Sequence, residues 1–118
     1  MLRDMELRQL RYFVAVAETS NISRAAQKLF LTQPALSRQI KALEDEIGQC
    51  LVERSAHSIR LTPAGDALLR EARELLQRVD AMLERVKDVV KRHLERFGER
   101  ENLRVDWEGD QQTVPSPS

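Results

Sequence analysis

Three polar residues in the first half of the chain, Gln33, Ser37 and Arg38, have side chains suited to directional hydrogen bonding. Glutamine and arginine can each make two hydrogen bonds to one base edge in the major groove of DNA, and serine can bond a base edge or a phosphate. If the segment is helical, positions 33 and 37 lie one turn apart. These residue types indicate recognition of a nucleic acid, although the same residues also suit an ordinary solvent-exposed helix face.

The segment from 33 to about 47 has the pattern of a helix that could present these side chains. Thr32 stands at the N-cap position, Pro34 falls in the first turn, where its missing N–H costs nothing, and Gly48 ends the pattern. One face repeats apolar residues at helical spacing, namely Leu36, Ile40, Leu43 and Ile47. We therefore expect the opposite face, which carries Arg38, to be exposed.

Two shorter helices are expected before it, over about 7–19 and 22–29, with Asn21 as the N-cap of the second. The expected apolar stripe of the first helix consists of Leu10, Phe13, Val14 and Ala17. In the second helix, Ala25 and Ala26 lie on the apolar stripe, and such small residues let another helix approach closely. Together these patterns predict a compact group of three helices.

Two short strands, 51–54 and 59–61, are expected to form a hairpin, and a long helix then runs from about 62 to about 96. Steps of four and three along this helix give the heptad pattern of a coiled coil. The seam residues expected to support dimerisation are Leu68, Ala72, Leu75, Val79, Met82, Val86 and Val89. Whether this seam packs within the chain or against a second chain is left open by the pattern.

Three helices, a hairpin and a long helix make up a mainly α fold: a winged helix-turn-helix with a small β-hairpin wing, followed by a long dimerisation or linker helix. We expect a DNA-binding domain over residues 1–62, a dimerisation helix over 63–97 and a polar, disordered tail over 98–118. Within the tail, Leu103–Val105 could form a stub of strand.

Composition excludes several other classes. The 118 residues carry 19 basic and 19 acidic side chains, with 42% hydrophobic residues, which suits one small folded domain rather than a disordered chain. No apolar run is long enough to span a membrane, and the sequence suggests a cytoplasmic protein. The single cysteine, Cys50, and the absence of a phosphate-binding glycine loop predict no metal, no cofactor and no enzymatic activity.

The chain resembles the N-terminal domain of LysR-type transcriptional regulators, through five stretches in the same order and spacing. These stretches are Leu7–Glu18 (LRQLRYFVAVAE), Ser23–Leu29 (SRAAQKL), Thr32–Glu44 (TQPALSRQIKALE), Leu51–Arg54 (LVER) and Leu61–Gly65 (LTPAG). The resemblance implies a bacterial regulator that binds double-stranded DNA as a homodimer or a higher oligomer, with its long helix pairing with that of a partner. Two recognition helices in successive major grooves would favour an interrupted palindrome.

The same resemblance implies roles for individual residues. The residues expected to read bases are Gln33, Pro34, Ala35 and Arg38. The residues that the resemblance places near phosphates are Ser23, Thr32 and Ser37. We add Lys41, Arg54 and His57 to the set expected near phosphates or in the wing. Lys41 suits a charge facing phosphate or solvent better than a base reader. The wing position of His57 is commonly arginine in the family, and histidine is mostly neutral at pH 7, so weaker or pH-sensitive wing contacts are expected.

Family members continue into a two-lobed effector-binding domain, whereas this sequence ends soon after Val105. We therefore expect no ligand sensing by this chain. One alternative is a dimerisation module that pairs through its long helix with full-length relatives and inhibits them. Another alternative is a monomeric DNA-binding protein outside this family, whose long helix only caps the body.

Overall fold

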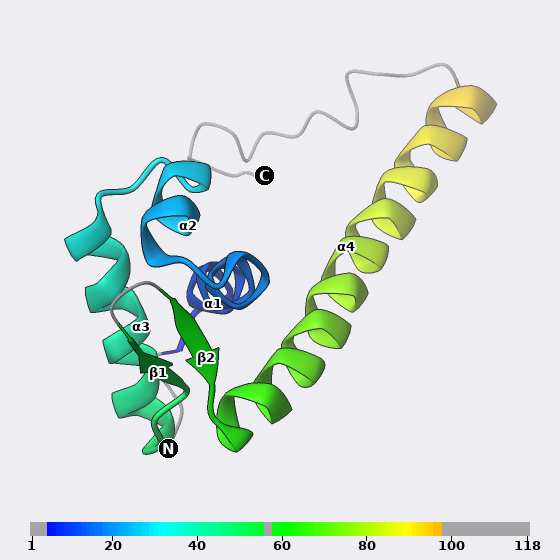
Figure 1. The fold of residues 1–118 in the computed structure, drawn as a ribbon. Coiled ribbons are helices and arrows are strands. Elements are labelled where there is room, and N and C mark those ends of the chain that lie inside the picture. The colour runs from blue at the N-terminus through cyan, green and yellow to red at the C-terminus, as the bar shows by residue number, and fades with distance from the viewer. Residues whose placement is uncertain (1–4, 56–57, 98–118) are drawn as a thin grey trace. The chain divides into compact units, whose positions relative to one another are not determined.

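The computed structural model describes residues 5–55 and 58–97, and the elements follow the expected order (Figure 1). The helices and strands are α1 (Leu7–Thr19), α2 (Ile22–Lys28), α3 (Gln33–Ile47), β1 (Val52–Arg54), β2 (Ile59–Leu61) and α4 (Pro63–Phe97). The expected mainly α class, with a two-stranded hairpin before a long helix, is confirmed. The predictions for His57, for the tail and for Leu103–Val105 lie outside the described residues.

Local capping interactions fix where α2 and α3 begin and end. Asn21 Oδ1 accepts a hydrogen bond from the backbone N–H of residue 24 at 2.9 Å, and Thr32 Oγ1 accepts one from that of residue 35 at 3.2 Å. Gly48 closes α3 in the left-handed conformation, with φ of 80°. The caps predicted from the sequence are therefore confirmed, and they set the start of α3 to within one residue.

The core forms where α1, α2 and α3 meet, and Figure 1 views α1 along its axis with the other two helices beside it. Phe13 and Val16 of α1, Leu36 and Leu43 of α3 and Leu51 before the hairpin are all fully buried. Burial of each such side chain stabilises the fold by about 1.5–3 kcal/mol. Ala25 and Ala26 of α2 lie in the same cluster, which is the close approach that their size predicted.

The expected apolar stripe of α1 was partly wrong. Val14 and Ala17 are only half-buried, whereas Val16, which lies off that stripe, is fully buried. The physical reason is that α1 is covered on two sides. One side packs in the cluster of α2 and α3, and on the other side Leu10 packs with Ala72 of α4. A single stripe cannot describe a helix that has two buried faces.

The hairpin is antiparallel, with Val52 opposite Leu61 and Arg54 opposite Ile59. Two backbone hydrogen bonds hold it. Ser55 N donates to Ser58 O at 2.9 Å across the turn, and Ile59 N donates to Ser20 O at 3.1 Å. Ile59 is itself buried in the core. The hairpin is thus attached both to the end of α1 and to the cluster of α1, α2 and α3.

The first turn of α4 is fixed against the loop before β1. Thr62 Oγ1 accepts a hydrogen bond from Gly65 N at 3.0 Å and donates one to Cys50 O at 2.7 Å, and Thr62 N donates to Leu51 O at 3.0 Å. Gly65 lies directly over the Leu51 carbonyl, where any Cβ atom would overlap the oxygen. A glycine is required here by close approach, not by a left-handed backbone.

The chain divides into two compact units, one up to Arg78 and one from Val79. In the first unit, Ala72 of α4 is 1% exposed and Leu76 is 9% exposed. In the second unit α4 exposes large apolar side chains, namely Met82, Leu83, Val86, Val89 and Val90. Among the described residues, no helix is long and apolar enough to cross a membrane.

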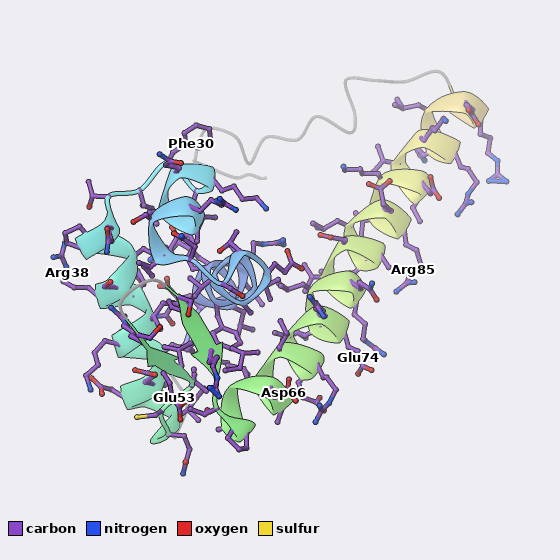
Figure 2. All side chains as sticks on the ribbon, viewed as in Figure 1. Phe30, Arg38, Glu53, Asp66, Glu74 and Arg85 are labelled. Carbon is purple, nitrogen blue, oxygen red and sulfur yellow. The ribbon has the colours of Figure 1, made fainter. Side chains whose placement is uncertain are left out.

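Phe30 departs from the usual behaviour of an aromatic residue. It lies in the turn between α2 and α3 with φ of 58° and is 95% exposed, and Figure 2 shows its ring at that turn. A left-handed backbone costs about 1–2 kcal/mol for a residue with a Cβ. Nothing in the structure explains why a phenylalanine stands at this position.

Replacing Gly65 with alanine should destabilise the fold by about 3 kcal/mol, because the added methyl group would push α4 away from the Leu51 carbonyl. In an ordinary helical position the same change stabilises by roughly 1 kcal/mol. Urea denaturation would measure the difference. Gly48→Ala is the matched control: its Cβ would meet nothing within 4 Å, and only backbone strain of about 1–2 kcal/mol is expected. A stabilised Gly65→Ala variant would contradict the close approach.

Candidate nucleic-acid interface

The outward face of α3 is the most distinctive polar surface of the first unit. Its buried face holds Leu36, Ile40 and Leu43, so the residues half a turn away are directed outward. Arg38 is exposed, and Figure 2 shows its side chain extending away from α1 and α2. Within residues 5–55 and 58–97, Arg38 makes no ion pair. Its five N–H donors are therefore available to a bound molecule.

The first turn of α3 continues this surface. Gln33 and Pro34 are exposed, and Ala35 is half-buried. Ser23 Oγ, near the start of α2, donates a hydrogen bond to Gln33 Oε1 at 3.0 Å. The amide of Gln33 is therefore held by a neighbouring helix, although the residue lies at the surface.

The hairpin supplies a second contact to the same face. Arg54 Nη1 donates a hydrogen bond to Ser37 Oγ at 3.3 Å. Because serine is neutral, this bond orients the guanidinium without neutralising its positive charge. Arg54 and Arg38 thus place two cationic groups beside the first half of α3, and a polyanion would be attracted to them.

Polar side chains from α2, α3 and the hairpin converge on one recess of about 360 Å³. Its lining residues are Asn21, Ile22, Ser23, Gln33, Arg54, Ser55, Ser58 and Ile59. Three of the residues predicted from the sequence, Ser23, Gln33 and Arg54, therefore lie around a single hollow.

Thr32 and Lys41 already have partners within the chain. The Thr32 side chain caps α3, so its oxygen serves the helix and only its O–H remains to meet a phosphate. Lys41 Nζ lies 3.1 Å from Asp45 Oδ1 one turn later, with both side chains largely exposed. The hydrogen bond that Lys41 donates to Asp45, together with the negative charge of Asp45, raises the pKa of Lys41 above its ordinary value. Lys41 therefore stays protonated, but Asp45 competes with any phosphate for its charge.

Sequence reasoning missed two groups that shape this surface. Glu44 Oε2 accepts hydrogen bonds from Leu51 N at 2.8 Å and Val52 N at 3.3 Å, and so ties the start of the hairpin to α3. The hydroxyl of Ser55 donates a hydrogen bond to the backbone carbonyl oxygen of Ser58 across the turn, at 3.2 Å. Bonds of this kind leave no signal in a linear pattern, because the partners meet only after the helices have packed.

The predicted seam of α4 is distributed over two environments. In the first unit Leu68 is half-buried and Ala72 is buried, so both pack within the chain, while Leu75 is exposed. In the second unit Met82, Val86 and Val89 are 48%, 56% and 59% exposed. The apolar surface that a partner could cover is therefore the later part of the seam.

A sequence model of the bacterial regulatory helix-turn-helix proteins of the lysR family matches residues 7–66. The HTH-type transcriptional regulator TfdS of Cupriavidus pinatubonensis is 55% identical over 73 residues, which cover 62% of this chain and 25% of TfdS. BenM of Acinetobacter baylyi, a regulator of the same type, is 47% identical over 85 residues, which cover 72% of this chain and 28% of BenM. The chain thus spans about a quarter of the length of these relatives.

Solved structures give the same result for the fold. The complex of the CbnR DNA-binding domain with DNA matches with a TM-score of 0.70 and 44% identity, covering 73% of this chain and 99% of that one. The BenM DNA-binding domain bound to its catB site 1 DNA matches with a TM-score of 0.71 and 46% identity, covering 73% and 97%. At 44% and 46% sequence identity, these matches indicate a common family as well as a common fold.

Proposed function

This chain belongs to the lysR family of bacterial regulatory helix-turn-helix proteins, and from that premise we propose that it is a transcriptional regulator that binds double-stranded DNA sequence-specifically. The observation that carries the proposal is the exposed first half of α3, where Arg38 has no ion-pair partner among the described residues. In the CbnR and BenM complexes, domains with this fold are bound to DNA.

In this proposal α3 enters the major groove. Arg38 and Gln33 bond base edges, while Pro34 and Ala35 supply the close apolar contact at the helix start. The cationic and hydroxyl groups around them meet the phosphate backbone, which fixes the register of the helix on the duplex. The phosphate set consists of Ser23, Thr32, Ser37, Lys41 and Arg54. His57 of the wing belongs to the same proposed set.

We also propose that the chain binds DNA as a homodimer, or a higher oligomer, through α4. The support is the run of exposed apolar residues at heptad spacing in the second unit, Met82, Val86 and Val89. In an isolated helix such a stripe stays in contact with water, so its apolar surface contributes no stabilising burial. Two copies of α3 related by symmetry would then read two half-sites about one helical turn apart, which form an interrupted palindrome.

In this proposal, residues 1–62 form the DNA-binding domain and residues 63–97 form the dimerisation helix. Ala72 and Leu68 pack on the body of the same chain, so in this proposal the first part of α4 anchors the helix and the later part meets the partner.

A second candidate function is favoured by the same exposed stripe. The chain could pair through α4 with a full-length relative and form mixed dimers. The support is the exposed apolar surface of α4. In this role DNA binding by the homodimer would not be needed.

Selection of the purified chain against a randomised duplex library should enrich an interrupted palindrome. Arg38→Ala and Gln33→Ala should each weaken binding to that operator by roughly tenfold, because each loses a base contact worth about 1–3 kcal/mol. Titration by fluorescence anisotropy measures the change. Arg85→Ala is the control, since it removes the same charge as Arg38→Ala from an exposed position on α4. Full specific affinity in both α3 variants would show that the reading face is misassigned.

Met82→Lys and Val86→Lys should dissociate the homodimer, because each buries a charge in the apolar contact between two α4 helices. Light scattering at micromolar concentration would report the change from dimer to monomer. Gln77→Lys adds the same charge at an exposed polar position outside the seam and should leave the dimer intact. A dimer that tolerates both seam variants would place the interface elsewhere.

Mixing the chain with full-length TfdS tests the second candidate. If it is right, size-exclusion chromatography resolves a hetero-oligomer at micromolar concentration, and the Met82→Lys variant forms none. Absence of any mixed species with the unaltered chain would end this candidate, and it would leave the proposal of specific DNA binding in place.

A further inference from the structure

The hydrogen bond between Ser23 and Gln33 links the two helices of the helix-turn-helix at its outer surface. The Oγ of Ser23 donates to Oε1 of Gln33 at 3.0 Å, across ten positions of sequence. A glutamine at an exposed helix start ordinarily rotates freely, and its amide can turn by 180° so that oxygen and nitrogen exchange places. Here one of its two ends is held.

Both residues of this bond lie on helix starts that are held in place by capping interactions and by the core. Ser23 lies in the first turn of α2, which Asn21 caps, and Gln33 opens α3, which Thr32 caps. Between them, Ala25 of α2 and Leu36 of α3 are fully buried in one cluster. The distance between the two helix starts is therefore set by the core, and the bond does not depend on a flexible loop.

We propose that Ser23 is a positioning residue that orients the amide of Gln33 and thereby sharpens the base preference of the reading face. The bond restrains the rotation of the Gln33 side chain, so its amide keeps one place relative to a base edge. A side chain that samples several rotamers places its donors and acceptor less accurately and so discriminates less between base pairs. This inference rests on the proposed binding of α3 to DNA.

A direct contact of Ser23 with a phosphate would have a different consequence. Phosphate contacts carry no sequence information, so their loss weakens binding to every sequence alike. A positioning role changes the relative affinities of the four base pairs at the position that Gln33 meets. The two roles can therefore be separated by a specificity profile, and a single affinity is not sufficient.

The structure offers matched variants for this test. Ser23→Ala removes the hydroxyl that holds Gln33, and Ser23→Thr keeps it. Ser55→Ala makes the same chemical change in the same recess, but the Ser55 hydroxyl bonds the Ser58 carbonyl and makes no bond to α3. Ser23 is exposed, so its replacement leaves no cavity, and thermal denaturation checks that each variant is folded.

The experiment is library selection with sequencing for each variant, followed by titration of operators that differ at one base pair. We expect the unaltered chain, Ser23→Thr and Ser55→Ala to discriminate by about tenfold at the pair that Gln33 reads. Ser23→Ala should reduce that factor to about threefold or less and leave the other positions unchanged. In a Gln33→Ala background, Ser23→Ala should have no further effect on the profile, since the two residues act as one unit.

Three outcomes would overturn the inference. A uniform loss of affinity in Ser23→Ala, with an unchanged profile, would make Ser23 a phosphate contact only. A profile and an affinity both unchanged would show that the bond does not control recognition. If the unaltered chain enriches no sequence, the proposed function itself is overturned, and the inference with it. In the first two outcomes the unaltered chain still selects an operator, so they can be told apart from the third.

Discussion

The close packing of α2 against α1 and α3 controls the rest of the structure. Ala25 and Ala26 are buried where these helices meet, next to Phe13 and Leu36. A larger side chain at either alanine would separate the helices, since cores tolerate little added volume. Because α3 rests on this contact with its apolar face, the direction of its polar face is decided there. The position of Arg38 at the surface follows from the burial of Leu36, Ile40 and Leu43 on the opposite face of α3.

Polar bonds refine what apolar packing establishes. The carboxylate of Glu44 accepts two backbone N–H groups at the start of the hairpin, and Arg54 of the hairpin returns to Ser37 of α3. Ser23 holds Gln33 from the other side. Apolar contacts fix the distances between helices but leave exposed side chains free to rotate. Side-chain hydrogen bonds from two neighbouring elements limit that freedom at the start of α3, where the proposed base contacts lie.

The long helix shows how one amphipathic pattern can serve two kinds of contact. Leu68 and Ala72 belong to the same heptad series as Met82 and Val86, yet the first pair packs inside the chain and the second pair is exposed. Leu10 of α1 packs with Ala72 and Leu76, and the apolar pattern of α4 continues to residues that are exposed. The proposed pairing of α4 with another helix rests on these exposed residues.

The sequence by itself determined the features that depend on neighbours within about four residues. The caps at Asn21, Thr32 and Gly48, the exposed face of α3 with Arg38, and the order of helices and hairpin could all be predicted, because capping and helical periodicity are local. Only the tertiary structure decided that α1 has two buried faces, that Ala72 packs within the chain, and that Ser23 holds Gln33. Those contacts join residues that are far apart in the sequence, from Ser23 and Gln33 to Leu10 and Ala72, and such residues meet only where the packed helices place them.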